Sequence, residues 1–109
     1  MNPRDMQVDL NPPLELGRLV VDAMVLEEAR VRIQWRLPNG TDDLPETVRV
    51  GRELFSNIQL HDETGLRFRY RGTYGGSQRG ETVFEPGVGS AVGALALSAD
   101  GRTAVVQLG

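Results

Sequence analysis

Apolar and polar residues alternate most regularly between Ala29 and Leu37. Every second position is apolar there, and the apolar set is Val31, Ile33, Trp35 and Leu37. A period of two places alternate side chains on opposite faces of a β-strand. The Asn39-Gly40 pair that follows is a strong turn signal. We therefore predict a strand that buries one face, with Trp35 in the core.

A second alternating stretch runs from Leu66 to Arg71. Its expected inward residues are Leu66, Phe68 and Tyr70, and its outward residues are Arg67, Arg69 and Arg71. The preceding segment, Asp62 to Gly65, has the composition of a tight turn in which Gly65 supplies a positive φ. With another strand expected near Asn57 to Leu60, this pattern predicts a β-hairpin.

Leu14 to Leu26 is consistent with two structures. Its apolar positions have helical spacing. However, Leu19 to Val21 and Met24 to Leu26 are β-favouring runs, and Gly17 would weaken a helix by about 1 kcal/mol. We interpret the segment as a strand from Leu14 to about Met24, perturbed by a bulge, with a helix as the alternative.

The remaining apolar runs are short and are separated by turn residues. The Asp100-Gly101 pair predicts a hairpin between the last two of them. Two glycine-rich stretches, Gly72 to Gly80 and Gly87 to Gly93, are interpreted as flexible connectors. The further expected strands lie near Thr47 to Val50, around Val83 and Phe84, and at Ala94 to Leu97 and Thr103 to Leu108.

About seven short strands with frequent turn signals are typical of a β-sandwich or a small barrel. The length of 109 residues fits one domain. Residues 1–13 are polar and contain three prolines, so we expect a flexible tail followed by a single β-sandwich domain over residues 14–109. The predicted core comprises Val31, Ile33, Trp35, Leu60, Phe68, Tyr70, Phe84 and Leu97.

Composition narrows the classes of partner. The net charge is −3 and all 12 basic residues are arginine, which does not favour a nucleic-acid binder. The chain has no cysteine, which excludes disulfides and thiol chemistry. No apolar run approaches the roughly 18 residues of a membrane helix, so we expect no membrane insertion. Residues 1–11 lack the apolar middle of a signal peptide, which favours the cytoplasm, whereas removal of a leader would leave an extracytoplasmic location open.

Arginines form two stripes along the expected strands, at Arg30, Arg32 and Arg36 and at Arg67, Arg69 and Arg71. Beside acidic strands they would form cross-strand ion-pair ladders, each pair worth under about 1 kcal/mol. Side by side, the two stripes would instead form a basic patch for an anionic partner.

The Gly72 to Gly80 segment carries an aromatic residue and an arginine. Such a loop on a rigid scaffold can be a recognition loop, and a merely flexible connection is the alternative. Together with the second arginine stripe it gives a candidate binding surface made of Arg67, Arg69, Arg71, Tyr74 and Arg79.

No pattern indicates catalysis, a metal or a cofactor. His61 is the single histidine, and its neighbour Asp62 would point to the opposite face of a strand. The acidic group Asp42, Asp43 and Glu46 lacks the spacing of a calcium loop, so we interpret it as a solvated loop. The glycines between Gly87 and Gly93 do not have the spacing or context of a dinucleotide fingerprint. We expect a chain that is not an enzyme.

The order of these features resembles a known class of domain. The Trp-containing strand Val31 to Leu37, the segment Leu60 to Tyr70, a glycine-rich loop and the Phe-x-Pro segment Val83 to Pro86 follow one another. This arrangement resembles the uncharacterised immunoglobulin-like β-sandwich domains of bacterial surface lipoproteins and anti-sigma-factor tails. The resemblance implies an antiparallel sandwich of about seven strands and an extracytoplasmic setting, and it supplies no catalytic residues.

The expected function is therefore a non-catalytic protein-interaction or structural module. One alternative is a barrel that binds a small ligand or an ion through the Gly72 to Gly80 and Asp42 to Glu46 segments. Another is a subunit of a homo-oligomer, because unprotected strand edges pair readily between copies.

Overall fold

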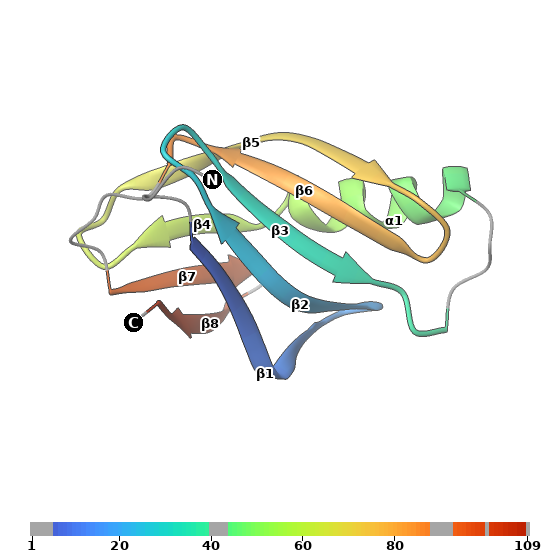
Figure 1. Cartoon of the computed structure of the whole chain (residues 1–109), viewed down its shortest axis with the longest axis horizontal. Helices are drawn as coiled ribbons and strands as arrows, with labels where there is room; N and C mark the ends of the chain where they lie inside the picture. Colours follow the sequence, from blue (N-terminus) through green and yellow to red (C-terminus); the bar gives the residue numbers. More distant parts are fainter. Residues whose placement is uncertain (1–5, 40–43, 88–92, 100, 109) are drawn as a thin grey trace.

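In the described part of the chain, eight antiparallel strands form one nearly closed, barrel-like sheet, with one helix packed on its inner side (Figure 1). The computed structural model describes residues 6–39, 44–87, 93–99 and 101–108. The spatial order of the strands is β1-β2-β3-β6-β5-β4-β7-β8. The elements are β1 (Met6–Leu16), β2 (Leu19–Leu26), β3 (Val31–Arg36), α1 (Leu44–Phe55), β4 (Gln59–Asp62), β5 (Arg67–Gly75), β6 (Arg79–Glu85), β7 (Ala94–Ala99) and β8 (Arg102–Gln107).

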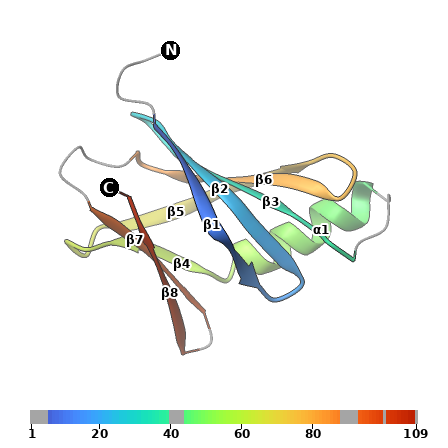
Figure 2. The ribbon, with the colours of Figure 1, turned by 60° about the horizontal axis from the view of Figure 1, so that its bottom comes forward.

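The prediction of a mostly β, antiparallel chain is confirmed, but the strands do not form two clearly separate sheets. β6 pairs with both β3 and β5, which keeps the larger half of the sheet continuous. The smaller half joins it through a narrow pairing of β4 with β5, at Leu60–Phe68 and His61–Arg67. The sheet order leaves β1 and β8 as its two edges (Figure 2).

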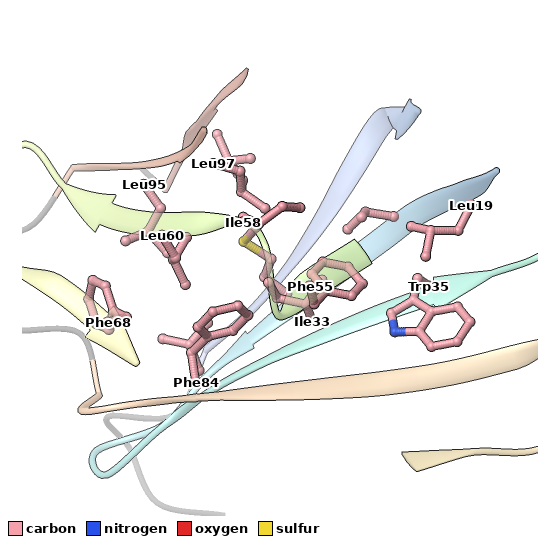
Figure 3. Close-up of a cluster of buried hydrophobic side chains, with 14 of the residues drawn as sticks. Leu19, Ile33, Trp35, Phe55, Ile58, Leu60, Phe68, Phe84, Leu95 and Leu97 are labelled. Carbon is pink, nitrogen blue, oxygen red and sulfur yellow. The ribbon is translucent and has the colours of Figure 1, made fainter. Parts of the chain in front are cut away.

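The core forms where the alternating strands point inward. Trp35 on β3 is 2% exposed, and its ring packs against Phe55 of α1, which in turn contacts Phe84 (Figure 3). Seven of the eight predicted core residues are buried; the eighth, Tyr70, is half-buried and meets Phe84 edge-on at 5.9 Å between ring centroids. The core prediction is therefore largely confirmed.

The helix α1 replaces the strand expected near Thr47 to Val50. Pro45 is tolerated in the first helical turn, where backbone N–H groups lack helical partners. Glu46 in that turn accepts hydrogen bonds from Arg49, which lower the pKa of its carboxyl group. The prediction was wrong because Thr and Val favour strands locally, whereas the buried residues recur at helical spacing, namely Thr47, Val50, Gly51 and Phe55.

The first apolar segment forms two strands instead of one. Gly17, with a φ of +58°, and Arg18 make a tight turn between β1 and β2. Residues 6–13, expected in a flexible tail, belong to β1 and pair with β2 up to Asp9. The register shifts between Asp9 and Leu14, and Pro12 and Pro13 lie inside that irregularity. An edge strand accommodates prolines because it needs hydrogen bonds on one side only.

The expected flexible loop over Gly72 to Gly80 is mostly regular β-structure. β5 extends to Gly75 and β6 begins at Arg79, and the two strands pair down to Gly75–Gly80. Gly80 in this hairpin serves close packing, because a Cβ atom there would overlap the Trp35 indole. Composition alone suggested flexibility, but the neighbouring indole explains the glycine.

The predicted turn at Asp62 to Gly65 is confirmed. The Asp62 carboxylate accepts hydrogen bonds from the Thr64 hydroxyl (2.6 Å), the Thr64 N–H (2.8 Å) and the Leu66 N–H (3.0 Å). These bonds, led by that of the Thr64 hydroxyl, lower the pKa of Asp62 below its ordinary value of 3.8. Leu66 is 44% exposed, so its expected inward position was wrong.

We expect Asp62→Asn to lower the thermal stability of the protein at neutral pH. A lowered folded-state pKa stabilises the fold above the usual carboxyl pKa, and this contribution is lost as the pH falls through the folded value. The deficit of the variant should therefore shrink below pH 3.8. Thermal unfolding across pH checks this, with the exposed Asp9→Asn as control. A deficit that does not change with pH would contradict the assignment to the carboxylate charge.

Candidate functional site

The strand β8 is a regular sheet edge. Within the described residues it pairs only with β7, in a continuous register from Ala94–Gln107 to Ala99–Arg102. The Leu108 N–H donates to the Gly93 carbonyl at 2.9 Å, in line with that register. Hydrogen-bonded and non-hydrogen-bonded pairs alternate along an antiparallel ladder. The backbone N–H groups that point away from β7 are therefore those of Thr103, Val105 and Gln107.

The β8 edge lacks the features that usually protect an exposed strand. It contains no proline and no register shift, and Arg102 is its only charged residue. Val105, at the middle of the strand, is 58% exposed. Natural edge strands are commonly blunted by prolines, bulges or charges. The other edge, β1, is blunted by its prolines and its register shift.

A groove follows β8 along its length. One part, of about 720 Å³, lies between residues 8–15 of β1 and Val105 to Gln107. The adjoining part, of about 580 Å³, is lined by the first half of β8, the β1–β2 turn and the end of α1. Both parts include Glu15. The apolar residues lining the second part are Leu16, Leu54, Ile58, Leu97, Ala99 and Ala104. The groove is an open seam between the two edges of the sheet.

The outward face of the β7–β8 hairpin is uncharged. Pairing places Ala96 beside both His61 of β4 and Val105 of β8, and these residues line a shallow pocket of about 320 Å³. His61 is half-buried there, and Asp62 and Glu63 of the neighbouring turn also line the pocket. The hairpin itself contributes contact area without charge, from Ala94, Ala96 and Val105.

The five residues of the predicted binding surface lie along β5 and at the start of β6. Arg67 and Arg69 are exposed on the first part of β5. Arg71 lies at the register shift that follows, and it pairs with Glu85 at 3.3 Å. Tyr74 and Arg79 line a separate pocket near the end of the β5–β6 hairpin.

The arginines of β3 and its preceding turn form an ion-pair ladder, as one alternative predicted. Arg30 and Arg32 both donate to Glu27, at 2.8 and 2.7 Å, and Arg32 also donates to Glu81 of β6. The hydrogen bond from Arg30 is the main cause of a lowered pKa at Glu27. Arg36 pairs with Asp22 of β2 at 3.0 Å. These charges are compensated within the sheet, which argues against a basic patch at β3.

Metal-ligating side chains do not cluster in the described part of the chain. No group of three or more acidic or histidine side chains there could hold a metal ion. Asp42 and Asp43 lie outside the described residues, and so do residues 88–92 of the glycine-rich connector. Glu46 belongs to α1 and pairs with Arg18 and Arg49. Among the described helices, none has the length and apolar character needed to cross a membrane.

Sequence reasoning missed the β8 edge as a candidate site, although a signal was present. Between Gly93 and Leu108 only Asp100 and Arg102 are charged. That sparse charge distinguishes the hairpin from the arginine-rich strands β3 and β5. Which strand ends a sheet depends on the strand order, and a local pattern does not give it.

The chain matches no family model, and comparisons with curated proteins and with solved structures found no significant match. The resemblance to immunoglobulin-like domains stays a prediction.

Proposed function

We propose that this chain is a non-catalytic protein-interaction module that binds one extended segment of a partner polypeptide along the free edge of β8. One observation supports the proposal most strongly: an unprotected, regular strand edge forms the wall of a groove with apolar lining. Addition of a strand to an open sheet edge is a common mode of peptide recognition.

In this proposal the incoming segment adds a ninth strand beside β8. Its backbone bonds to the N–H and C=O groups of Thr103, Val105 and Gln107, which supply affinity for any extended chain. Its alternate side chains enter the groove, so it should carry apolar residues at every second position. Asp9 and Glu15 on the β1 wall favour basic residues elsewhere in the segment.

The groove suits a single segment better than the edge of a second sheet. β1 lines the side of the groove opposite Val105 to Gln107. If the edge strand of a second sheet paired with β8, the next strand of that sheet would be brought towards β1. This geometry favours a peptide or a free tail over pairing of two β8 edges, so self-association is the weaker alternative.

As part of the same proposal, we interpret the sheet as an immunoglobulin-like sandwich. Its two layers would be β1-β2-β3-β6-β5 and β4-β7-β8, joined at the short β4–β5 pairing. In such an arrangement the seam between β1 and β8 is the open side of the sandwich.

A peptide titration tests the proposal. The probes are capped six-residue peptides, the length of β8, with Val, Ile or Leu at alternate positions and Thr or Lys between them. Peptides of the same composition with contiguous apolar residues are the controls. We expect saturable binding of the alternating set, measured by fluorescence anisotropy on the wild-type chain. Equal binding of both sets would indicate nonspecific apolar adsorption and contradict strand addition.

We expect Val105→Pro to weaken binding of the alternating peptides by about tenfold or more, since it removes an outward N–H and the hydrogen bond it would make. Proline at this position leaves the β7 pairing intact, because the Val105 N–H points away from β7. Val105→Thr keeps the N–H and is the matched control, with nearly unchanged affinity expected. Unchanged affinity in Val105→Pro, with the fold preserved by circular dichroism, would overturn the edge assignment.

A further inference from the structure

A second pocket lies on the outward face of the larger half of the sheet, away from β8. It has a volume of about 520 Å³, and its polar lining comes from four adjacent strands. Tyr74 of β5 pairs in register with Glu81 of β6, which pairs with Gln34 of β3, and Asp22 of β2 lies beyond. Trp35, Arg79 and the glycines of the β5–β6 hairpin complete the lining.

The Tyr74 ring packs against this face of the sheet at a defined position. Its hydroxyl oxygen and two ring carbons lie 3.3–3.6 Å from the position that a Cβ on Gly72 would take. The ring therefore rests over a glycine of its own strand, and a Cβ at position 72 would be in contact with it. Tyr74 is still 64% exposed. An aromatic ring held against the sheet with so much of it exposed is a stacking platform for a ligand.

The two carboxylates in the lining are fixed and neutralised. Glu81 accepts from Arg32 at 2.9 Å, and Asp22 accepts from Arg36 at 3.0 Å. An ionised carboxylate has more lone pairs than these bonds use, so both groups can still accept from a ligand hydroxyl. Gln34 adds an amide that both donates and accepts. Because both carboxylates are already paired, they do not call for a cationic ligand. Arg79 is also charged, and the Arg79→Gln variant tests its role.

We propose that this pocket binds a neutral saccharide. A pyranose ring has an apolar C–H face, which stacks on an aromatic side chain, and a rim of hydroxyl groups that both donate and accept hydrogen bonds. Tyr74 supplies the platform, while Gln34, Glu81 and Asp22 supply planar hydrogen-bonding groups beside it. The volume lies within the usual range of small-ligand sites and fits one or two sugar units. This inference is independent of the proposed β8 interaction, because the two sites share no residue.

The test uses the ¹⁵N-labelled full chain and a panel of neutral oligosaccharides: cellotetraose, maltotetraose, mannotetraose and chitotetraose. We expect at least one of them to shift the amide resonances of Gly75, Gly76 and Gly80 in a saturable way. Tyr74→Ala should weaken that binding by about tenfold or more through loss of the stacking ring, whereas Tyr74→Phe, which keeps the ring, should change it by about threefold at most.

Three results would overturn the proposal: no shift with any member of the panel at millimolar concentration, equal binding to Tyr74→Ala, or tighter binding of a uronic-acid oligosaccharide that is lost in Arg79→Gln. The last would assign the pocket to an anionic ligand. Both Tyr74 variants alter a largely exposed side chain, so their folding can be verified by the unchanged resonances of the β7–β8 hairpin.

Discussion

Replacing Trp35 with alanine is expected to lower the free energy of unfolding by about 3–5 kcal/mol, the usual cost of truncating a large buried aromatic side chain. Trp35 is 2% exposed and lies between the sheet and α1. Its indole N–H donates to the Thr82 hydroxyl at 3.1 Å, and Thr82 is hydrogen-bonded in turn to Thr73. Truncation therefore removes apolar contacts and leaves a buried hydroxyl with one partner fewer.

Chemical denaturation at equilibrium measures this loss, with Trp35→Phe as the companion variant. Phenylalanine keeps most of the apolar contacts and loses the hydrogen bond to Thr82, so its loss should be clearly smaller than that of alanine. A loss below about 1 kcal/mol for Trp35→Ala would be typical of a surface position and would mean that the indole is not buried against α1.

Replacing Gly51 with alanine is expected to destabilise the protein, although alanine favours a helix interior over glycine by about 1 kcal/mol. A Cβ atom at position 51 would lie within 3.0 Å of two carbons of the Trp35 indole. Real Cβ atoms do not approach other atoms so closely, so either α1 or the indole must move. Overpacking of this kind costs about 1–3 kcal/mol, occasionally more, and outweighs the gain in helix propensity.

The two substitutions should be coupled. In the Trp35→Phe background the smaller ring leaves room for the new methyl group, so Gly51→Ala should destabilise that variant much less than the wild type. Gly76→Ala is the control glycine, because nothing lies within 4 Å of its Cβ position. A stabilising Gly51→Ala in the wild type would show that helix propensity dominates and that α1 does not approach Trp35 this closely.

The contact between Gly51 and Trp35 also illustrates why some parts of the fold could be predicted from the sequence and others could not. The β3 strand was recognisable because its alternation is local and uninterrupted, and the C-terminal hairpin was recognisable from Asp-Gly. α1 was not predicted because its buried face includes Thr47 and Gly51, neither of which is a typical helix core residue. Gly51 is there because the indole lies against it, which is tertiary information.

Glycine and proline were misinterpreted for the same reason. Gly72 to Gly80 suggested flexibility, yet Gly80 accommodates the Trp35 ring inside a regular hairpin. Pro12 and Pro13 suggested a tail, yet an edge strand with a register shift accommodates them. In both cases residues that disfavour regular structure in isolation are used where a neighbour or a free edge removes the penalty.

The candidate sites were only partly visible in the sequence. Tyr74 and Arg79 were selected as binding residues, and the structure places them together in one pocket. Arg67 and Arg69 were selected with them. They lie on the part of β5 before the register shift and do not line that pocket. The β8 edge could not be selected, because its exposure depends on strand order and not on its own residues.

Hydrogen exchange of the β8 amides, measured by NMR with and without a bound alternating peptide, shows whether the peptide pairs with the free edge of β8. In the free protein the amides of Ala104, Val106 and Leu108 should be protected, and those of Thr103, Val105 and Gln107 should exchange rapidly. If the peptide adds as a strand, it should slow exchange at Thr103, Val105 and Gln107 and leave exchange at the other three amides unchanged. Binding without this alternating gain in protection would contradict strand addition at β8.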